Sequence, residues 1–71
     1  MTIISQDRDS IIDSQGGCIY LVEKEVLFSK LGVRNEVLGV YPDENRAKKV
    51  FSLLVERFKM GNDGYFEMPK E

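Results

Sequence analysis

Residues 43–60 read DENRAKKVFSLLVERFKM and contain the clearest structural pattern in the chain. Apolar residues recur there every three or four positions, which places them on one face of an α-helix. They are Ala47, Val50, Phe51, Leu54, Val55 and Phe58. Asp43 suits the N-cap, because its carboxylate can accept a hydrogen bond from a backbone amide two or three residues later. Gly61 suits the end of the helix, because glycine readily adopts the left-handed backbone conformation that often terminates helices. We predict a helix over about residues 43–60 and expect the rest of the chain to provide the surface on which it packs.

The chain has 71 residues, which is enough for one compact domain, residues 1–71, with a small core. Cys18 is the single cysteine and histidine is absent. A disulfide within the chain is therefore excluded, and a structural zinc site is not expected, because such sites usually take four nitrogen or sulfur ligands. Small domains often gain stability by association, and we expect this domain to do so.

The composition, with 42% hydrophobic and 31% charged residues, is typical of a globular protein. The formal net charge of −2 is too small to attract a polyanion. The first residues show no basic segment followed by an apolar one, and no apolar run approaches the length of a membrane span. We expect a cytoplasmic protein that makes no membrane contact.

Short stretches rich in β-branched and aromatic residues predict strands. These stretches are residues 2–6, 10–13, 18–23, 26–30 and 36–41, with residues 65–68 as a candidate for a final short strand. The intervening residues 7–9, 14–17, 31–35 and 62–64 are predicted turns and loops. Short connections allow only antiparallel neighbours, whereas the strand after the helix could run in either direction. The pattern predicts an α+β fold: a small, mainly antiparallel sheet of about five short strands with the helix on one face.

The three best strands are apolar on both faces, unlike strands of a sheet that has one face in water. Within residues 18–23, one face carries Cys18, Tyr20 and Val22, and the other carries Ile19 and Leu21. In the strand at residues 26–30, Val26 and Phe28 lie on one face and Leu27 on the other. In the strand at residues 36–41, Val37 and Tyr41 share one face, and Leu38 and Val40 share the other. One helix covers one face only. The other face needs the N-terminal isoleucines (Ile3, Ile4, Ile11, Ile12), the C-terminal Tyr65, Phe66 and Met68, or a second copy of the protein.

Two apolar residues of the predicted helix, Leu53 and Met60, project away from its main apolar stripe. Single exposed apolar residues are normal in proteins, so they either have no special role or form part of a contact surface. Together with Ile19 and Leu21 they make a candidate self-association surface. We expect a homodimer, or binding to another protein that the sequence does not identify.

No residue pattern indicates an enzyme. Without histidine, the commonest general base and metal ligand is missing. Cys18 lies in an apolar strand, where a thiol is expected to pack as a small hydrophobic group. Asp7, Asp9 and Asp13 lack the spacing of a calcium-binding loop and are expected to be solvated turn residues. The glycine pair at 16–17 precedes a strand, unlike a phosphate-binding loop. We expect no catalytic residue, metal, cofactor or small-molecule ligand.

An alternative function is a small regulator that binds nucleic acid through the basic polar face of the helix. Its candidate contacts are Lys48, Lys49 and Lys59. With Arg46 and Arg57, these cations spread over about 180° of the polar face, with Glu56 among them. Glu44 can pair with Lys48 to stabilise the helix itself. A solvated helix face is the simpler interpretation. We therefore favour a non-enzymatic protein-interaction or structural module.

Three short segments carry a resemblance to a known group of proteins. They are Ile4-Ser5-Gln6-Asp7, then Gly39-Val40-Tyr41-Pro42-Asp43-Glu44 followed by Ala47, and Phe66-Glu67-Met68-Pro69. They resemble small uncharacterised proteins encoded by prophages and other mobile elements of Gram-positive bacteria, which begin with a short SQD segment and show G-x-Y-x-T-E-E-x-A before their helix. Asp43 here takes the place of the capping threonine. The resemblance implies a bacterial or phage cytosolic origin and transfers no activity and no site.

Overall fold

The computed structural model describes residues 1–61 and 64–71 and contains six strands and one helix. In chain order they are β1 (Thr2–Ile4), β2 (Ile11–Asp13), β3 (Cys18–Val22), β4 (Glu25–Lys30), β5 (Val33–Val40), α1 (Glu44–Lys59) and β6 (Tyr65–Glu67). The predicted α+β class is confirmed. Of the predicted turn at 62–64, only Gly64 lies within the described residues.

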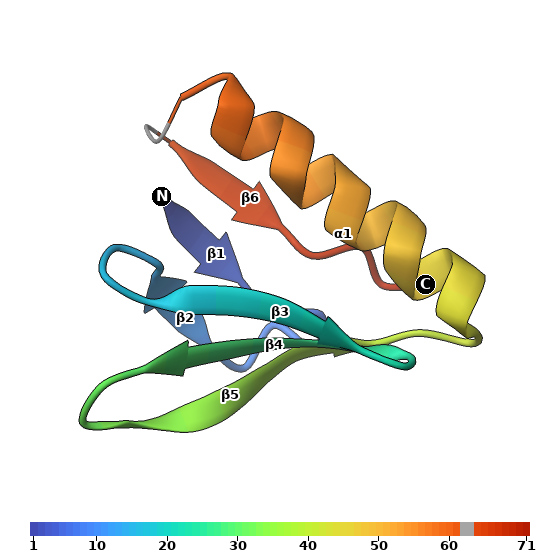
Figure 1. The fold of residues 1–71 in the computed structure, drawn as a ribbon, viewed down its shortest axis with the longest axis horizontal. Coiled ribbons are helices and arrows are strands. Elements are labelled where there is room, and N and C mark those ends of the chain that lie inside the picture. Colours follow the sequence, from blue (N-terminus) through green and yellow to red (C-terminus); the bar gives the residue numbers. More distant parts are fainter. Residues whose placement is uncertain (62–63) are drawn as a thin grey trace.

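The strands form two three-stranded sheets, where the sequence predicted one sheet. Strands β2-β1-β6 make the first sheet, in which β1 is antiparallel to β2 and parallel to β6. Strands β3-β4-β5 make the second, which is antiparallel throughout. The parallel pair is possible because the chain between β1 and β6 is long and includes α1. Figure 1 shows β1, β6 and α1 on the same side of the second sheet.

Helix α1 begins and ends within one residue of the predicted bounds. Asp43 is the N-cap, and its carboxylate Oδ1 accepts a hydrogen bond from the Arg46 amide at 2.8 Å. Arg57 and Lys59 lie in the last turn, where positive charge is favourable. Gly61, just after the helix, has a φ of +134°, which L side chains rarely adopt.

Strand β5 begins at Val33, inside the residues 31–35 that were predicted to form a loop. The strand is longer than its apolar pattern suggested, because its first residues complete the hairpin with β4, where Lys30 pairs with Val33. Pairing in a hairpin depends on the neighbouring strand as well as on the strand's own residues. The polar Arg34 and Asn35 are therefore accommodated as exposed strand residues.

A β-bulge at Leu38 changes which residues of β5 face the core. The neighbouring β4 residues Leu27 and Val26 pair with Val37 and Gly39 of β5, so Leu38 has no partner and is an extra residue in the strand. Leu38 and Tyr41 are buried, whereas Val37 and Val40 are about half exposed. The face division predicted for residues 36–41 was therefore wrong, because it assumed a strict alternation that the bulge interrupts.

A single core lies between α1 and the two sheets. Its buried apolar residues are Ile3, Val26, Phe28, Leu38, Tyr41, Ala47, Val50, Leu54 and Met68. Ile3 of β1 and Met68 after β6 thus pack on the same side of the second sheet as α1. The opposite face carries Val22 and Val37, each 47% exposed.

The turn after β1 ties the two sheets together through Gln6. Its side-chain Nε2 donates to the Val40 carbonyl at 2.9 Å and to the Lys70 carbonyl at 2.8 Å, and its Oε1 accepts from the Val40 amide at 2.8 Å. Its backbone amide donates to the Leu38 carbonyl at 2.8 Å. Gln6 therefore joins the first sheet to the bulged end of β5 and to the C-terminal tail.

Two further contacts hold the tail in the same cluster. The Arg8 guanidinium donates to the carbonyls of Ser5 at 2.9 Å and Met68 at 2.8 Å. The Tyr41 hydroxyl donates to the Pro69 carbonyl at 2.8 Å. The Tyr41 ring also lies over Gly39, where an added Cβ would come within 2.7 Å of the hydroxyl oxygen. The glycine is therefore required for this packing.

We expect Gln6→Ala to lower the free energy of unfolding by about 1–3 kcal/mol, because the Val40 backbone groups lose their partners at the junction of the sheets. Urea denaturation measures the change. Gln15→Ala, in the exposed loop before β3, is the matched control and should stay within about 0.5 kcal/mol of the parent protein. Equal stability of the two variants would contradict the bridging role of Gln6.

Ionisation of the Tyr41 phenol should lower the free energy of unfolding at alkaline pH. Burial raises the pKa of its phenol to about 12, although nearby Arg46 and Arg8 act in the opposite direction. Because the pKa in the folded state exceeds the ordinary value of 10.0, the stabilisation is complete below about pH 10 and is lost as the pH rises towards 12. Tyr41→Phe should be less stable than the parent by about 1 kcal/mol near pH 9. That deficit should shrink or reverse near pH 11.5, measured by urea denaturation; a constant deficit would contradict this assignment.

Candidate interaction site

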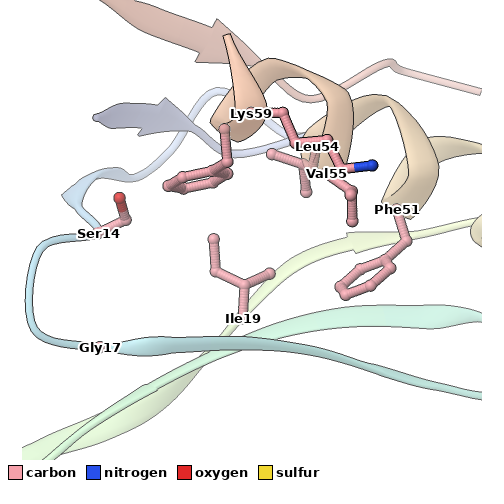
Figure 2. A pocket seen from close by; sticks show the side chains of 8 residues that line it. Ser14, Gly17, Ile19, Phe51, Leu54, Val55 and Lys59 are labelled. Carbon is pink, nitrogen blue, oxygen red and sulfur yellow. The ribbon is translucent and has the colours of Figure 1, made fainter. Parts of the chain in front are cut away.

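An open apolar groove of about 450 Å³ lies between α1 and β3. Figure 2 shows Phe51 and Leu54 of the helix facing Ile19 of the strand across the groove, with Ser14 and Gly17 at one end. Val55, Phe58 and Lys59 of the helix also line the groove. Its volume lies within the range of small-molecule pockets, about 300–1,000 Å³.

The helix side of the groove is formed by the flank of its apolar stripe. Phe51, Val55 and Phe58 are four and three residues apart, so they lie in a row beside the buried Leu54. Phe51 and Phe58 are half-buried, and Val55 is 38% exposed. The stripe is therefore wider than the surface that the sheets cover.

The strand side of the groove is formed by β3, which is an edge strand of its sheet. Ile19 points from the inner face of β3 towards the helix and is half-buried. The groove exists because the sheet ends at β3, so no further strand lies under Phe51, Val55 and Phe58. Gly17 closes one end, where a Cβ would collide with the Phe28 ring.

The structure separates the four residues predicted for self-association. Ile19 lines the groove, and Leu21 packs against the core from the same face of β3. Leu53 and Met60 are 49% and 82% exposed. At about 100° per residue they project from the side of α1 opposite Val55. Self-association through any of the four stays a prediction, but only Ile19 belongs to the groove.

Sequence reasoning assigned Phe51, Val55 and Phe58 to the helix stripe without separating the covered residues from the exposed ones. The periodicity shows which residues share a face, but it does not show where the sheet under that face ends. The sheet ends at β3, and only the strand order of the folded chain reveals this.

The predicted nucleic-acid contacts do not form a compact basic surface. Lys48, Lys49 and Lys59 are exposed and span roughly 100° around the helix. The Lys59 Nζ lies 3.7 Å from the Glu56 carboxylate, and Lys59 also lines the groove. Glu56 therefore offsets positive charge within the sector that would face a phosphate backbone.

Cys18 is exposed, so the expectation that it packs as a core residue was wrong. It projects from the outer face of β3. Asp7 and Asp9 lie in the turn after β1, as expected. Asp13 is instead the last residue of β2, where it pairs with Thr2, so the expectation was wrong for that residue. The Ser5 hydroxyl donates to the Asp7 carboxylate at 2.6 Å and, with the Asp9 amide, holds the pKa of Asp7 below its ordinary value. Within residues 1–61 and 64–71, no three side chains gather as metal ligands.

The groove beside the edge strand β3 gives this small α+β domain an exposed surface that is apolar on both sides. Comparisons of the chain with protein-family models, curated proteins and solved structures found no match. Among the described residues, no helix has both the length and the apolar character needed to cross a membrane.

Proposed function

We propose that this protein is a non-enzymatic protein-interaction module that self-associates through the groove between α1 and β3. The observation that carries the proposal is the exposed apolar row of Phe51, Val55 and Phe58 opposite Ile19. Apolar surface of this kind marks contact sites, because its removal from water stabilises a complex. The resemblance to mobile-element proteins supports a role in the bacterial cytoplasm.

The chemistry of the groove suits a protein better than a small polar ligand. Sites for small molecules combine apolar walls with several converging polar groups that orient the ligand. Here the lining includes two polar side chains, those of Ser14 and Lys59. They lie apart in Figure 2, and Ser14 already donates its hydroxyl to the Met1 carbonyl at 2.9 Å. Apolar side chains of a protein partner need no such orienting groups.

We expect the parent protein to sediment as a dimer and Val55→Glu to sediment as a monomer. The new carboxylate would have to leave water when the groove is covered, which weakens association by about 2 kcal/mol or more. Leu53→Glu is the matched control, because Leu53 is at least as exposed on the same helix but projects away from the groove.

Three outcomes of sedimentation contradict the proposal in different ways. A monomeric parent protein at high concentration would remove self-association altogether. Loss of the dimer in Leu53→Glu, but not in Val55→Glu, would move the contact to the surface formed by Leu53 and Met60. Equal loss in both variants would point to unfolding, which circular dichroism of each variant would detect.

The alternative, a regulator that binds nucleic acid, depends on Lys48, Lys49 and Lys59. Since Glu56 lies among these lysines, we expect no retention of duplex DNA or single-stranded RNA in a gel at ~50 mM salt and micromolar protein. Retention that fades as salt rises, and that Lys48→Glu with Lys49→Glu removes, would favour the alternative instead.

A further inference from the structure

The C-terminal tail, residues 68–71, is held by side chains from several elements. Figure 1 shows it passing from the end of β6 to the first turns of α1. Four side chains donate in turn to four successive main-chain oxygens of the tail, and we call these side chains the donor row. The donor and acceptor residues are Arg8 and Met68 at 2.8 Å, Tyr41 and Pro69 at 2.8 Å, Gln6 and Lys70 at 2.8 Å, and Arg46 and Glu71 at 2.7 Å.

The donor row is complementary to the backbone of an extended peptide. Arg8 and Arg46 carry guanidinium groups, which can only donate. The Gln6 Oε1 already accepts from the Val40 amide, so the amide nitrogen is the group that Gln6 turns to the tail. Every residue of an extended peptide presents a carbonyl to such a row. Proline suits it well, because proline brings no backbone amide.

One side chain of the tail supplies an apolar anchor. Met68 is 0% exposed within the core, and its amide donates to the Ile4 carbonyl at 2.9 Å. Pro69 is half-buried, whereas Lys70 and Glu71 are exposed. The contacts of the tail therefore require a large apolar residue directly before proline and allow varied residues after it.

The segment that carries the tail has few other contacts with the core. Strand β6 has three residues and is an edge strand, hydrogen-bonded to β1 within the described residues. Tyr65 and Glu67 are exposed, and Phe66 is half-buried. Segments with few buried apolar contacts open at a lower free energy than the whole domain. Residues 65–71 should therefore open while α1 and the second sheet stay folded.

We propose that the donor row and the Met68 site form a peptide-binding site, which the chain's own tail occupies. Its partner is an extended segment of another protein in which a large apolar residue precedes proline. The tail is an internal competitor: when residues 65–71 open, the partner segment makes the same carbonyl contacts in their place. Other residues line the groove between α1 and β3, so this inference does not depend on self-association.

Binding of a labelled peptide tests the proposal. The probe is fluorescein-labelled YFEMPKE, the sequence of residues 65–71 with an amidated end, and fluorescence anisotropy measures its dissociation constant. Met68→Ala removes the anchor of the internal competitor, so the probe should bind this variant at least about 10-fold more tightly than it binds the parent protein. Met68→Val, which leaves a smaller cavity, takes its place where circular dichroism shows Met68→Ala to be unfolded.

Matched controls make this binding specific. The probe YFEAPKE, which lacks the methionine, should bind neither protein. Added to Met68→Ala, the replacement Arg46→Ala should weaken binding of YFEMPKE by about 3- to 10-fold, because one donor to the peptide is lost. Lys48→Ala, exposed on the same helix, should leave it unchanged. Equal binding of the two probes, or no binding of YFEMPKE to a folded variant, would overturn the proposal.

Hydrogen exchange of the parent protein tests the opening of the tail independently. The Met68 amide is bonded to the Ile4 carbonyl, so it exchanges when the segment opens. We expect its protection factor to be at least about 10-fold below those of Val50 and Leu54, which are buried in α1. Equal protection of all three amides would mean that the tail leaves only when the whole domain unfolds, which would overturn its role as a competitor.

Sedimentation identifies the occupant of the site. A parent dimer that excess YFEMPKE dissociates, and that Val55→Glu leaves intact, would place the tail of a second copy on the donor row and overturn the assignment to another protein. A dimer that Val55→Glu dissociates, in a protein whose folded Met68 variants bind no probe, would overturn this inference and leave the proposed function standing.

Discussion

The arrangement of this protein depends on one side-chain amide, that of Gln6, which takes the place of a neighbouring strand beside Val40. Its oxygen accepts from the Val40 amide and its nitrogen donates to the Val40 carbonyl, as a paired strand would do. The first sheet, the second sheet and the C-terminal tail meet at this point. Because the two sheets share no strand within the described residues, this contact, together with the common core, sets the position of one relative to the other.

Three segments that are far apart in the sequence, residues 4–7, 39–44 and 66–69, come together in the folded chain. Gln6 from the first contacts Val40 of the second, and Tyr41 of the second donates to Pro69 of the third. Arg8, just after the first segment, binds the Met68 carbonyl. These residues therefore have a structural role in this chain.

The groove follows from where the second sheet ends. A helix with an apolar stripe as wide as that of α1 needs support beneath Phe51, Val55 and Phe58, and β3 is the last strand on that side. The same edge position leaves backbone groups of β3 without a sheet partner. The exposed apolar row and the unpaired strand edge thus have one origin. This common origin distinguishes the groove from the isolated exposed residues Leu53 and Met60.

Local patterns in the sequence determined α1 and its caps, the strands from β1 to β4, the α+β class and the inner and outer faces of β3, because each depends on residues close together in the chain. The tertiary structure alone decided that there are two sheets, that β6 runs parallel to β1, and that the bulge at Leu38 turns Val37 and Val40 outward. It also decided which part of the helix stripe stays exposed, and so where the groove lies. These features depend on pairings between distant segments, and no local pattern of apolar residues specifies which strand becomes an edge.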